Sequence, residues 1–503
     1  MTENTNHKAQ RLNIEAAKRV VATVKTTLGP MGMDKMMVDG GGNVIVTNDG
    51  ATILRELDSA HPAAKMLVEV AKVQETNCYD GTTSSVVLAG QLLSNAETLF
   101  DKGLHPNIIG RGYSDALRMV LEELPQLETL PDVSGKGSKR TDSPRLTDIA
   151  STAITGKSLE AATDAVAELC VKTIEAVGDV KDVRVLAAPG GSLQDSYLFE
   201  GVVINKDVVT TDGQFTDTES LSALLINSGL EEQKQDGNVQ VQVDATSYGA
   251  VKNAGREHLL EAAQRIEAAQ PDIVFVRDGV HDTVVQYLRK RNIFVVRRVP
   301  ESTMKRLGNE FGSKPYHMAE DGMDVSRAVV DRRRYNDVDY LFVASDIASS
   351  EATLVLFGAT QSTLDEVQRG FDDALGVVSL IHNGDRLCYG GGTAYLELAS
   401  RLRSRASEVG GRGQMAIDAF ADALEIIPST IAENAGHSGL DTVLAMRHEG
   451  YGYGPDVHNG GIVHMAKWRV YEPETLVRSA ITTATEVTTA MLRIDDIIGR
   501  KEG

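Results

Sequence analysis

The order in which helical and strand-like patterns follow one another constrains this chain more than any other feature. Apolar residues recur at helical spacing near both ends, whereas the middle carries short β-branched runs separated by helical segments. With 503 residues, the chain is too long for a single hydrophobic core. If the two helical ends fold together, the middle is an insertion joined by two chain segments. Such a double connection forms a hinge.

The N-terminal part carries clear local patterns. Helical spacing of apolar residues predicts a first helix over residues 14–28, which Gly29 and Pro30 end. The β-rich run at residues 44–47 predicts a strand, and Pro62 is expected to open a second helix. Asp49 is therefore predicted to lie just past the end of a strand, where chemistry is often placed.

The middle of the chain alternates strands and helices. Compact β-branched runs predict buried strands at residues 273–276, 293–296, 340–343 and 353–356, with a helix around residues 284–288. After Gly384 the pattern returns to helices, expected over residues 395–402, 415–427 and 474–498. The chain thus combines helical ends with an α/β middle that contains a buried sheet.

Charge and cysteine content exclude several classes of protein. The formal net charge of −20 argues against non-specific nucleic-acid binding, which needs a basic surface. No apolar run approaches the ~20 residues that cross a bilayer, and we expect no membrane partner and a cytoplasmic location. Three widely spaced cysteines match no metal-ligand pattern and are expected to be small buried side chains: Cys78, Cys170 and Cys388.

A nucleotide site is predicted between residues 27 and 90. Asp49 and Asp80 are each followed by glycine, and a helix is expected to begin near Gly81. The free backbone amides of a helix start favour anions, and a carboxylate offers a hard oxygen to Mg²⁺. Hydroxyl groups follow at once, at Thr82, Thr83 and Ser84. The alternative is an aspartate that caps a helix, followed by small residues at a packing surface.

Several strings in collinear order resemble the archaeal and eukaryotic (group II) chaperonins. They are LGPMGMDKM at 28–36, TNDGATIL at 47–54, DGTT at 80–83, ADALEIIP at 421–428, AENAG at 432–436, EP at 472–473 and LRIDD at 492–496. The strings extend over nearly the whole chain, so agreement by chance is far less plausible than for one isolated motif.

The resemblance implies a multidomain chaperonin fold of α and α/β parts. A helical equatorial domain that binds ATP would comprise residues 1–139 and 391–503, and a small α/β intermediate hinge domain residues 140–201 and 358–390. An α/β apical domain at residues 202–357 would bind substrate and carry a helical protrusion as a built-in lid, placed near residues 244–260.

The resemblance also implies an ATP-dependent molecular chaperone that assembles with other chaperonin subunits into a homo- or hetero-oligomeric double ring. Unfolded polypeptides would be enclosed and folded in the ring cavity, driven by hydrolysis of Mg-ATP. The implied cofactors are ATP and Mg²⁺, with K⁺ as a further candidate.

The family's site residues carry over onto matching positions. Asp80 would be the magnesium ligand, Asp49 would position or activate the attacking water, and Asp373 would be the catalytic aspartate of the intermediate domain. The resemblance also implies that the backbone lies close to the nucleotide at Leu28, Gly29, Pro30, Gly81 and Gly391. Phosphate-binding hydroxyls are implied at Thr82, Thr83 and Ser84. Asp372 is the neighbour most easily mistaken for Asp373, which fits the family string better.

Two further positions have a second interpretation. Glu472 matches a ribose-binding position, but it would also suit the start of a helix as an N-terminal negative charge. Lys157 matches a loop that senses the γ-phosphate, but it could equally be a surface lysine after a turn.

Two residues depart from the family pattern. Met31 stands where a basic residue is usual, and Tyr79 stands where glycine precedes the key aspartate. Tyrosine lacks the backbone freedom of glycine, so the Asp80 turn is the place where altered nucleotide affinity or turnover is expected.

These departures motivate an alternative function, a hydrolysis-impaired structural subunit of a mixed chaperonin ring. A third class, a small-molecule kinase or dinucleotide enzyme, is disfavoured. No Gly-x-Gly-x-x-Gly follows a strand of the middle region. The chain has no complete Walker-type Gly-x-x-x-x-Gly-Lys-Thr/Ser, because Ser151 stands where the first glycine would precede Gly156 and Lys157.

Overall fold

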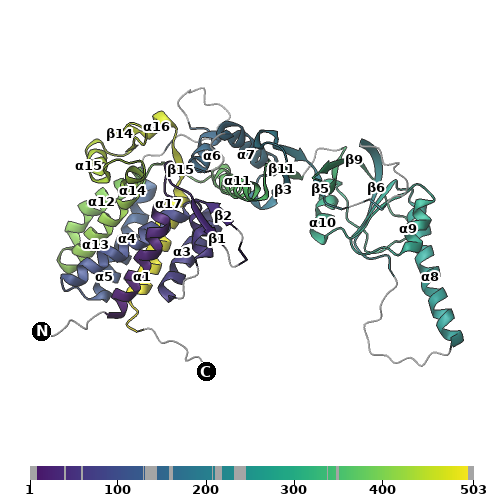
Figure 1. Cartoon of the computed structure of the whole chain (residues 1–503), viewed down its shortest axis with the longest axis horizontal. Helices are drawn as coiled ribbons and strands as arrows, with labels where there is room; N and C mark the ends of the chain where they lie inside the picture. The colour runs from purple at the N-terminus through teal and green to yellow at the C-terminus, as the bar shows by residue number, and fades with distance from the viewer. Residues whose placement is uncertain are drawn as a thin grey trace. The chain divides into compact units, whose positions relative to one another are not determined.

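The computed structural model describes residues 8–38, 41–42, 44–57, 61–127, 130, 144–157, 162–206, 208–209, 218–231, 245–336, 338–346 and 351–496. The chain forms two compact units (Figure 1). The first combines Met1–Val180 with Asp365–Gly503, so that both ends of the chain contribute to it, and the second is Lys181–Leu364. The finer division into three domains stays a prediction.

The first unit is mainly helical. Its helices are α1 (Lys8–Lys25), α2 (Gly50–Glu56), α3 (Pro62–Cys78), α4 (Thr82–Asp101), α5 (Pro106–Glu123), α6 (Leu146–Ile154), α7 (Thr163–Val177), most of α11 (Gln361–His382), α12 (Thr393–Val409), α13 (Gly411–Leu424), α14 (Ile426–Asn434), α15 (Gly439–Glu449), α16 (Met465–Trp468) and α17 (Glu474–Leu492). Short antiparallel pairs join β1 (Lys35–Val38) to β2 (Val44–Thr47), β12 (Leu387–Tyr389) to β15 (Tyr471–Pro473), and β13 (Tyr453–Pro455) to β14 (Ile462–His464).

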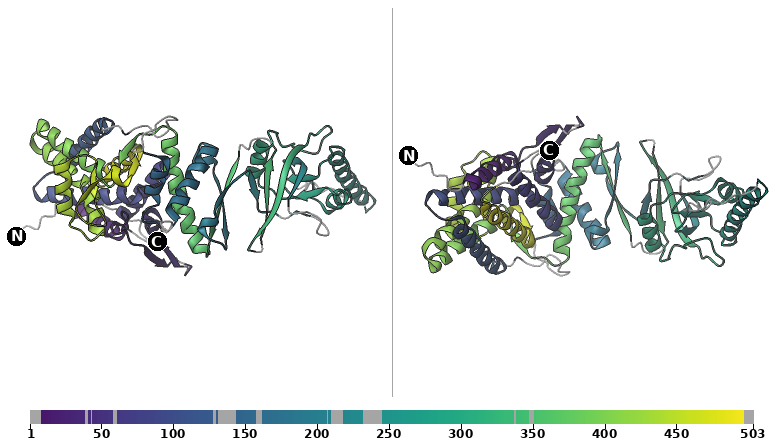
Figure 2. Two further views of the ribbon diagram at one scale, coloured as in Figure 1. Left: turned by 90° about the horizontal axis from the view of Figure 1, so that it is seen from above. Right: turned by 90° about the horizontal axis from the view of Figure 1, so that it is seen from below.

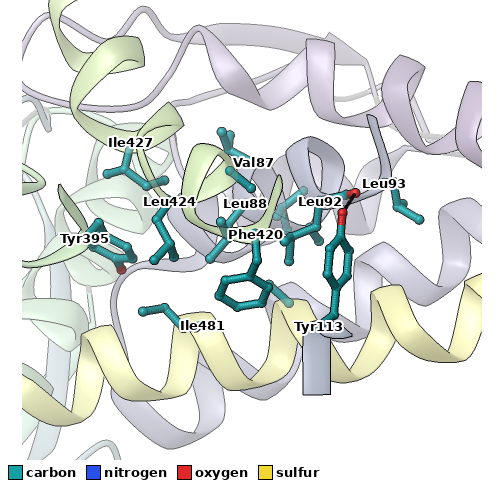
Figure 3. Close-up of a cluster of buried hydrophobic side chains, with 14 of the residues drawn as sticks. Val87, Leu88, Leu92, Leu93, Tyr113, Tyr395, Phe420, Leu424, Ile427 and Ile481 are labelled. Atoms are coloured by element: carbon teal, nitrogen blue, oxygen red, sulfur yellow. Dashed lines mark hydrogen bonds between the residues drawn. The ribbon is translucent and has the colours of Figure 1, made fainter. Parts of the chain in front are cut away.

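The core of the first unit forms where α4 packs between α1, α3, α13 and α17. Figure 3 shows Leu88 and Leu92 of α4 beside Phe420 of α13 and Ile481 of α17, and all four are fully buried. Burial of such a side chain stabilises the fold by about 1.5–3 kcal/mol. Because helices surround α4, its first residues are held in a fixed position.

Several helix ends differ from those expected from the sequence. The first helix ends at Lys25, not at residue 28, and the last ends at Leu492, not at residue 498. The helix expected over residues 415–427 is two helices, α13 and α14, which meet at Glu425. Pro428 has no N–H to donate, and it therefore falls in the first turn of a new helix. The predicted start of α3 at Pro62 and the strand at residues 44–47 are confirmed.

The second unit contains two sheets (Figures 1 and 2). A six-stranded sheet has the order β5 (Val202–Ile204), β10 (Val338–Ser345), β9 (Ser326–Tyr335), β6 (Thr218–Ile226), β7 (Ile273–Val276) and β8 (Phe294–Val296), in which β6, β7 and β8 run parallel. A three-stranded sheet has the order β3 (Arg184–Pro189), β11 (Ala352–Gly358) and β4 (Tyr197–Glu200). The strand predicted at residues 273–276 is confirmed.

Helices cover both faces of the six-stranded sheet. Residues of β6 alternate, so that Leu224 and Ile226 pack against α8 (Ala245–Ala268) and α9 (Asp282–Arg289), while Leu225 faces α10 (Glu301–Glu310). Residue 244 of the expected lid lies outside the described residues, and the rest of that range falls in α8. Its role as a lid stays a prediction.

Candidate functional site

Every site residue expected from the sequence lines one cavity of the first unit, with a volume of about 1010 Å³. These residues are Leu28, Gly29, Pro30, Asp49, Asp80, Gly81, Thr82, Thr83, Ser84, Lys157, Asp373, Gly391 and Glu472. Asp372, the alternative to Asp373, is not among the lining residues. The fold therefore brings together positions that are up to several hundred residues apart in the sequence.

Asp49 lies between β2 and α2, as its sequence predicts. Its carboxylate caps α2 by accepting hydrogen bonds from the backbone N–H groups of Ala51 (3.2 Å) and Thr52 (2.9 Å). Asp49 is thus the N-cap of α2 and also lines the cavity, whereas Asp80 does not cap α4, whose N-cap is Gly81. Backbone donors fix the orientation of this carboxylate at the cavity wall.

The turn that carries Asp80 is left-handed on both sides of the aspartate. Gly81 has φ 79°, and Tyr79 has φ 66°, a conformation that glycine adopts more readily than other residues. Gln74 holds the turn by donating a 3.0 Å hydrogen bond from Nε2 to the Asp80 carbonyl. The turn thus forms with tyrosine before the aspartate, in a backbone conformation that favours glycine.

The N-terminus of α4 presents backbone donors to the cavity. Gly81 occupies the N-cap position, so the start of this helix has no side-chain cap. The first N–H groups of a helix have no partners within the helix, and the helix dipole favours anions at this end. Thr82, Thr83 and Ser84 form the first turn and line the cavity. This arrangement suits phosphate oxygens.

Lys157 connects two of the predicted carboxylates. Its Nζ lies 2.6 Å from Oδ2 of Asp373, which α11 contributes, and 3.7 Å from Oδ1 of Asp80. The side chain is 17% exposed, so the interpretation of Lys157 as a solvated surface lysine is wrong. The preceding Gly156 accepts a hydrogen bond from Asn48 Nδ2, and this bond anchors the loop beside Asp49.

Burial and the neighbouring charges shift the pKa values of Asp373 and Lys157. Burial raises the pKa of Asp373 to about 8, against the opposing effect of the Lys157 ammonium. The carboxylates of Asp80 and Asp49 also raise it. Burial lowers the pKa of Lys157, but these carboxylates outweigh burial, so its pKa is raised and it stays protonated. Asp373 thus has the proton affinity of a base that operates near neutral pH.

The cluster also favours an added cation. Three carboxylates face a single ammonium group, so the fully ionised cluster has excess negative charge. Two like charges about 4 Å apart repel by about 4 kcal/mol at an effective dielectric constant of about 20. Among the described residues, no group of three or more His, Cys, Asp or Glu side chains forms a metal cage. Mg²⁺ bound with a polyphosphate needs only one or two carboxylates.

A different part of the cavity carries unpaired polar groups. Glu472 lies on β15 opposite Cys388 of β12. Within the described part of the chain, Glu472 Oε1 and the hydroxyl of Tyr395 are buried without a hydrogen-bond partner. Burial, and then the Asp80 carboxylate, raise the pKa of Glu472 to about 8. Buried polar atoms without partners are rare, and here they offer hydrogen bonds to a ligand.

Reasoning from the sequence missed Tyr395, Gly392 and Trp468, which also line the cavity. Tyr395 falls in the first turn of α12, directly after the glycine run, so its position relative to Gly391 could have indicated it. Gly392 has φ 78° and is the N-cap of this helix. Trp468 had no signal in the sequence, because it comes from the separate short helix α16.

Two further expectations are tested by the structure. All three cysteines are free and buried, as expected. None of the helices in the described part of the chain combines the length and apolar character that a membrane crossing requires.

The chain is similar to known proteins over nearly its whole length. The sequence model of the TCP-1/cpn60 chaperonin family matches residues 20–502. The chain is 39% identical to thermosome subunit alpha of Halobacterium salinarum, over 97% of this chain and 88% of that protein. It is 39% identical to a thermosome subunit of Methanopyrus kandleri, over 98% of this chain and 92% of that protein. Identity to thermosome subunit alpha of Thermoplasma acidophilum is 38%, with the same coverage of both chains.

Proposed function

Because the chain belongs to the TCP-1/cpn60 chaperonin family, we propose that its cavity binds Mg-ATP and that Asp373 acts as the base in hydrolysis. The chain is an ATP-dependent group II chaperonin subunit that couples ATP hydrolysis to protein folding. The observation that carries the site assignment is the contact of Lys157 with both Asp373 and Asp80 in one cavity.

The residues present fit a magnesium nucleotide. The excess negative charge of the cluster and the uncapped start of α4 offer complementary sites for a cation and for phosphate oxygens. Asp80 would hold the cation, and the first turn of α4 would hold the phosphates. When bound, Mg²⁺ would neutralise the charge of the phosphate oxygens. The same negative charge would also accommodate K⁺.

The carboxylates would divide the work of hydrolysis. Asp373 would accept the proton of the attacking water, which its raised pKa favours. Asp49, oriented by its bonds to the start of α2, would help to position that water. Lys157 would bind the γ-phosphate, which competes with Asp373 for the same ammonium. The nucleotide would thereby release Asp373 from its ion pair.

Glu472 is proposed to bind the ribose. Its neutral form dominates below about pH 8, and it can then both donate and accept a hydrogen bond. The buried Tyr395 hydroxyl lies close enough for the Glu472 charge to raise its pKa further, beyond the effect of burial. The Glu472 carboxyl group and the Tyr395 hydroxyl would contact the nucleoside part of ATP.

Replacing Glu472 with alanine should raise KM for ATP roughly tenfold while kcat changes little, because a buried hydrogen bond to the bound nucleotide is lost. Steady-state kinetics with ATP, 2′-deoxy-ATP and 3′-deoxy-ATP would measure this. The isosteric Glu472→Gln variant should keep most of the affinity. Equal sensitivity of the parent and Glu472→Ala to the loss of each ribose hydroxyl would contradict the ribose assignment.

The rate should also depend on pH through Asp373. A base acts only when ionised, so kcat/KM should rise with pH until about 8 and then level off. Lys157→Ala removes the positive charge that opposes the raised pKa, so the midpoint should move to higher pH. Lys157→Arg keeps the charge and serves as the control. An unchanged midpoint in Lys157→Ala would mean that another group limits the rate.

Assembly and domain organisation are proposed on the same basis. We propose a double ring with other chaperonin subunits that encloses unfolded polypeptides, and the equatorial, intermediate and apical division described above. The β1–β2 hairpin supports a subunit contact, because Met36 and Val38 are 75% and 68% exposed. Buried, free cysteines fit the proposed cytoplasmic location.

The function is tested by ATPase and refolding assays on the same preparation. Release of a chemically denatured protein in active form should require Mg-ATP and should fail with a non-hydrolysable analogue. The alternative, a hydrolysis-impaired subunit, would show nucleotide binding without turnover. The turn at Tyr79 does not favour it, since Asp80 lies beside Lys157.

A further inference from the structure

Tyr79 and Gly376, two residues whose type is unfavourable for their backbone conformation, contact each other without lining the cavity. Tyr79 is a non-glycine residue at φ 66°, and Gly376 is a glycine within helix α11. A methyl group added to Gly376 would lie 2.0 Å from Cγ of Tyr79 and 2.4 Å from its Cβ and Cδ2. The ring therefore lies directly on the helix backbone, where no larger residue than glycine fits.

The contact joins the two elements that carry Asp80 and Asp373. Tyr79 is the residue before Asp80, and Gly376 is three residues after Asp373, on the same side of α11. Tyr79 and Gly376 do not line the cavity. The ring is thus placed to set the distance between two elements of the site and not to touch a ligand.

Both partners carry a local cost, and Tyr79 does so at the C-cap of α3, where the chain leaves the helix. Left-handed backbone is unfavourable for tyrosine, and glycine weakens the interior of a helix. Residues that break local rules and meet at a site are expected to serve the site. Glycine at position 376 leaves the space that the Tyr79 ring occupies, so the contact accounts for the glycine within α11.

We propose that Tyr79 is a positioning residue for Asp373. Its ring, held against Gly376, keeps α11 at the separation from the Asp80 turn at which Lys157 reaches both carboxylates, at 2.6 Å and 3.7 Å. This inference rests on the proposed function, because it concerns the geometry of the same hydrolytic site. It differs from the family pattern, in which glycine precedes the aspartate and no ring is available.

The decisive variant is Tyr79→Gly. Glycine adopts φ 66° without strain, so the turn and the fold should survive. The thermal midpoint of unfolding should fall no further than it does for a typical surface substitution. Loss of the ring should lower kcat by about tenfold, because displacement of a catalytic group by a fraction of an ångström is costly. Tyr79→Phe keeps the ring and should retain the parental rate.

Nucleotide binding provides a separate readout. Trp468 is the only tryptophan of the chain and lines the cavity, so its fluorescence reports binding of ATP in every variant. A positioning residue that lies outside the cavity should leave the affinity unchanged while kcat falls. A parallel loss of affinity, or a Tyr79→Phe variant as slow as Tyr79→Gly, would overturn the proposal.

Two double variants show whether the effect of Tyr79 depends on Gly376 and on Asp373. Gly376→Ala should slow the parent, because its methyl group meets the ring, but should add little in the Tyr79→Gly variant. Likewise, Tyr79→Gly should not slow Asp373→Ala further. Additive effects in either pair would overturn the proposal. If Asp373→Ala itself keeps the parental rate, the proposed role of Asp373 as the base fails. If that variant is inactive but Tyr79→Gly is not impaired, only this inference fails.

Discussion

Replacing Asp373 with alanine should lower kcat for ATP hydrolysis by about a hundredfold or more, since general-base catalysis contributes that much or more. The physical reason is the environment of this carboxylate. Burial raises its pKa to about 8, so it binds a proton far more readily than an exposed aspartate. No such base remains when alanine takes its place, and the attacking water must lose its proton to solvent. Nucleotide binding, reported by Trp468 fluorescence, should persist.

Asp372 provides a matched control for this variant. It precedes Asp373 on α11 and does not line the cavity. Asp372→Ala should therefore hydrolyse ATP at close to the parental rate, with both variants assembled to the same extent. Equal kcat values for Asp373→Ala and the parent protein would refute the assignment of Asp373 as the base.

Removal of Mg²⁺ by excess chelator should abolish hydrolysis, and the activity should return when the cation is restored. The phosphate groups of ATP would enter a cavity that already contains Asp49, Asp80 and Asp373. Like charges about 4 Å apart repel by about 4 kcal/mol each at an effective dielectric constant of about 20, so the nucleotide needs a cation beside it.

Asp80 should set the concentration of Mg²⁺ that activity requires. In Asp80→Ala one carboxylate ligand is lost. The Mg²⁺ concentration at half-maximal activity should therefore rise roughly tenfold or more. Titration of the ATPase rate with Mg²⁺ at fixed ATP would measure the shift, with Asp385→Ala as a control, since Asp385 does not line the cavity. Activity that persists in excess chelator, or an unshifted titration in Asp80→Ala, would exclude Asp80 as the ligand.

Parts of the site could be predicted because their physical basis is local. Gly81 precedes a run of hydroxyl residues, and a helix start with free N–H groups follows from those few residues alone. Asp49 was expected after a strand, and it lies there because β2 ends at Thr47. The position of Asp373 came from resemblance to a family. Nothing in the neighbourhood of residue 373 indicates which groups it would face.

Other features depended on contacts between distant segments. Lys157 had two interpretations of equal weight, and only the arrangement of α11 beside its loop shows it to be buried against Asp373. Tyr79 suggested an altered turn, whereas the folded chain accommodates it through Gly376, almost three hundred residues later in the sequence. The helix ends predicted at residues 28 and 498 were misplaced, and the junction at Glu425 was missed, because apolar periodicity continues beyond the point where the backbone hydrogen bonds stop.

By itself, the sequence determined the alternation of helical ends and an α/β middle, the capped and uncapped helix starts, and membership of a chaperonin family through collinear strings. The tertiary structure decided which charges lie together and how strongly each holds its proton. The reason is that periodicity and capping act over a few residues, whereas the pKa of Asp373 depends on burial and on charges from Lys157, Asp80 and Asp49, which only the folded chain brings within range.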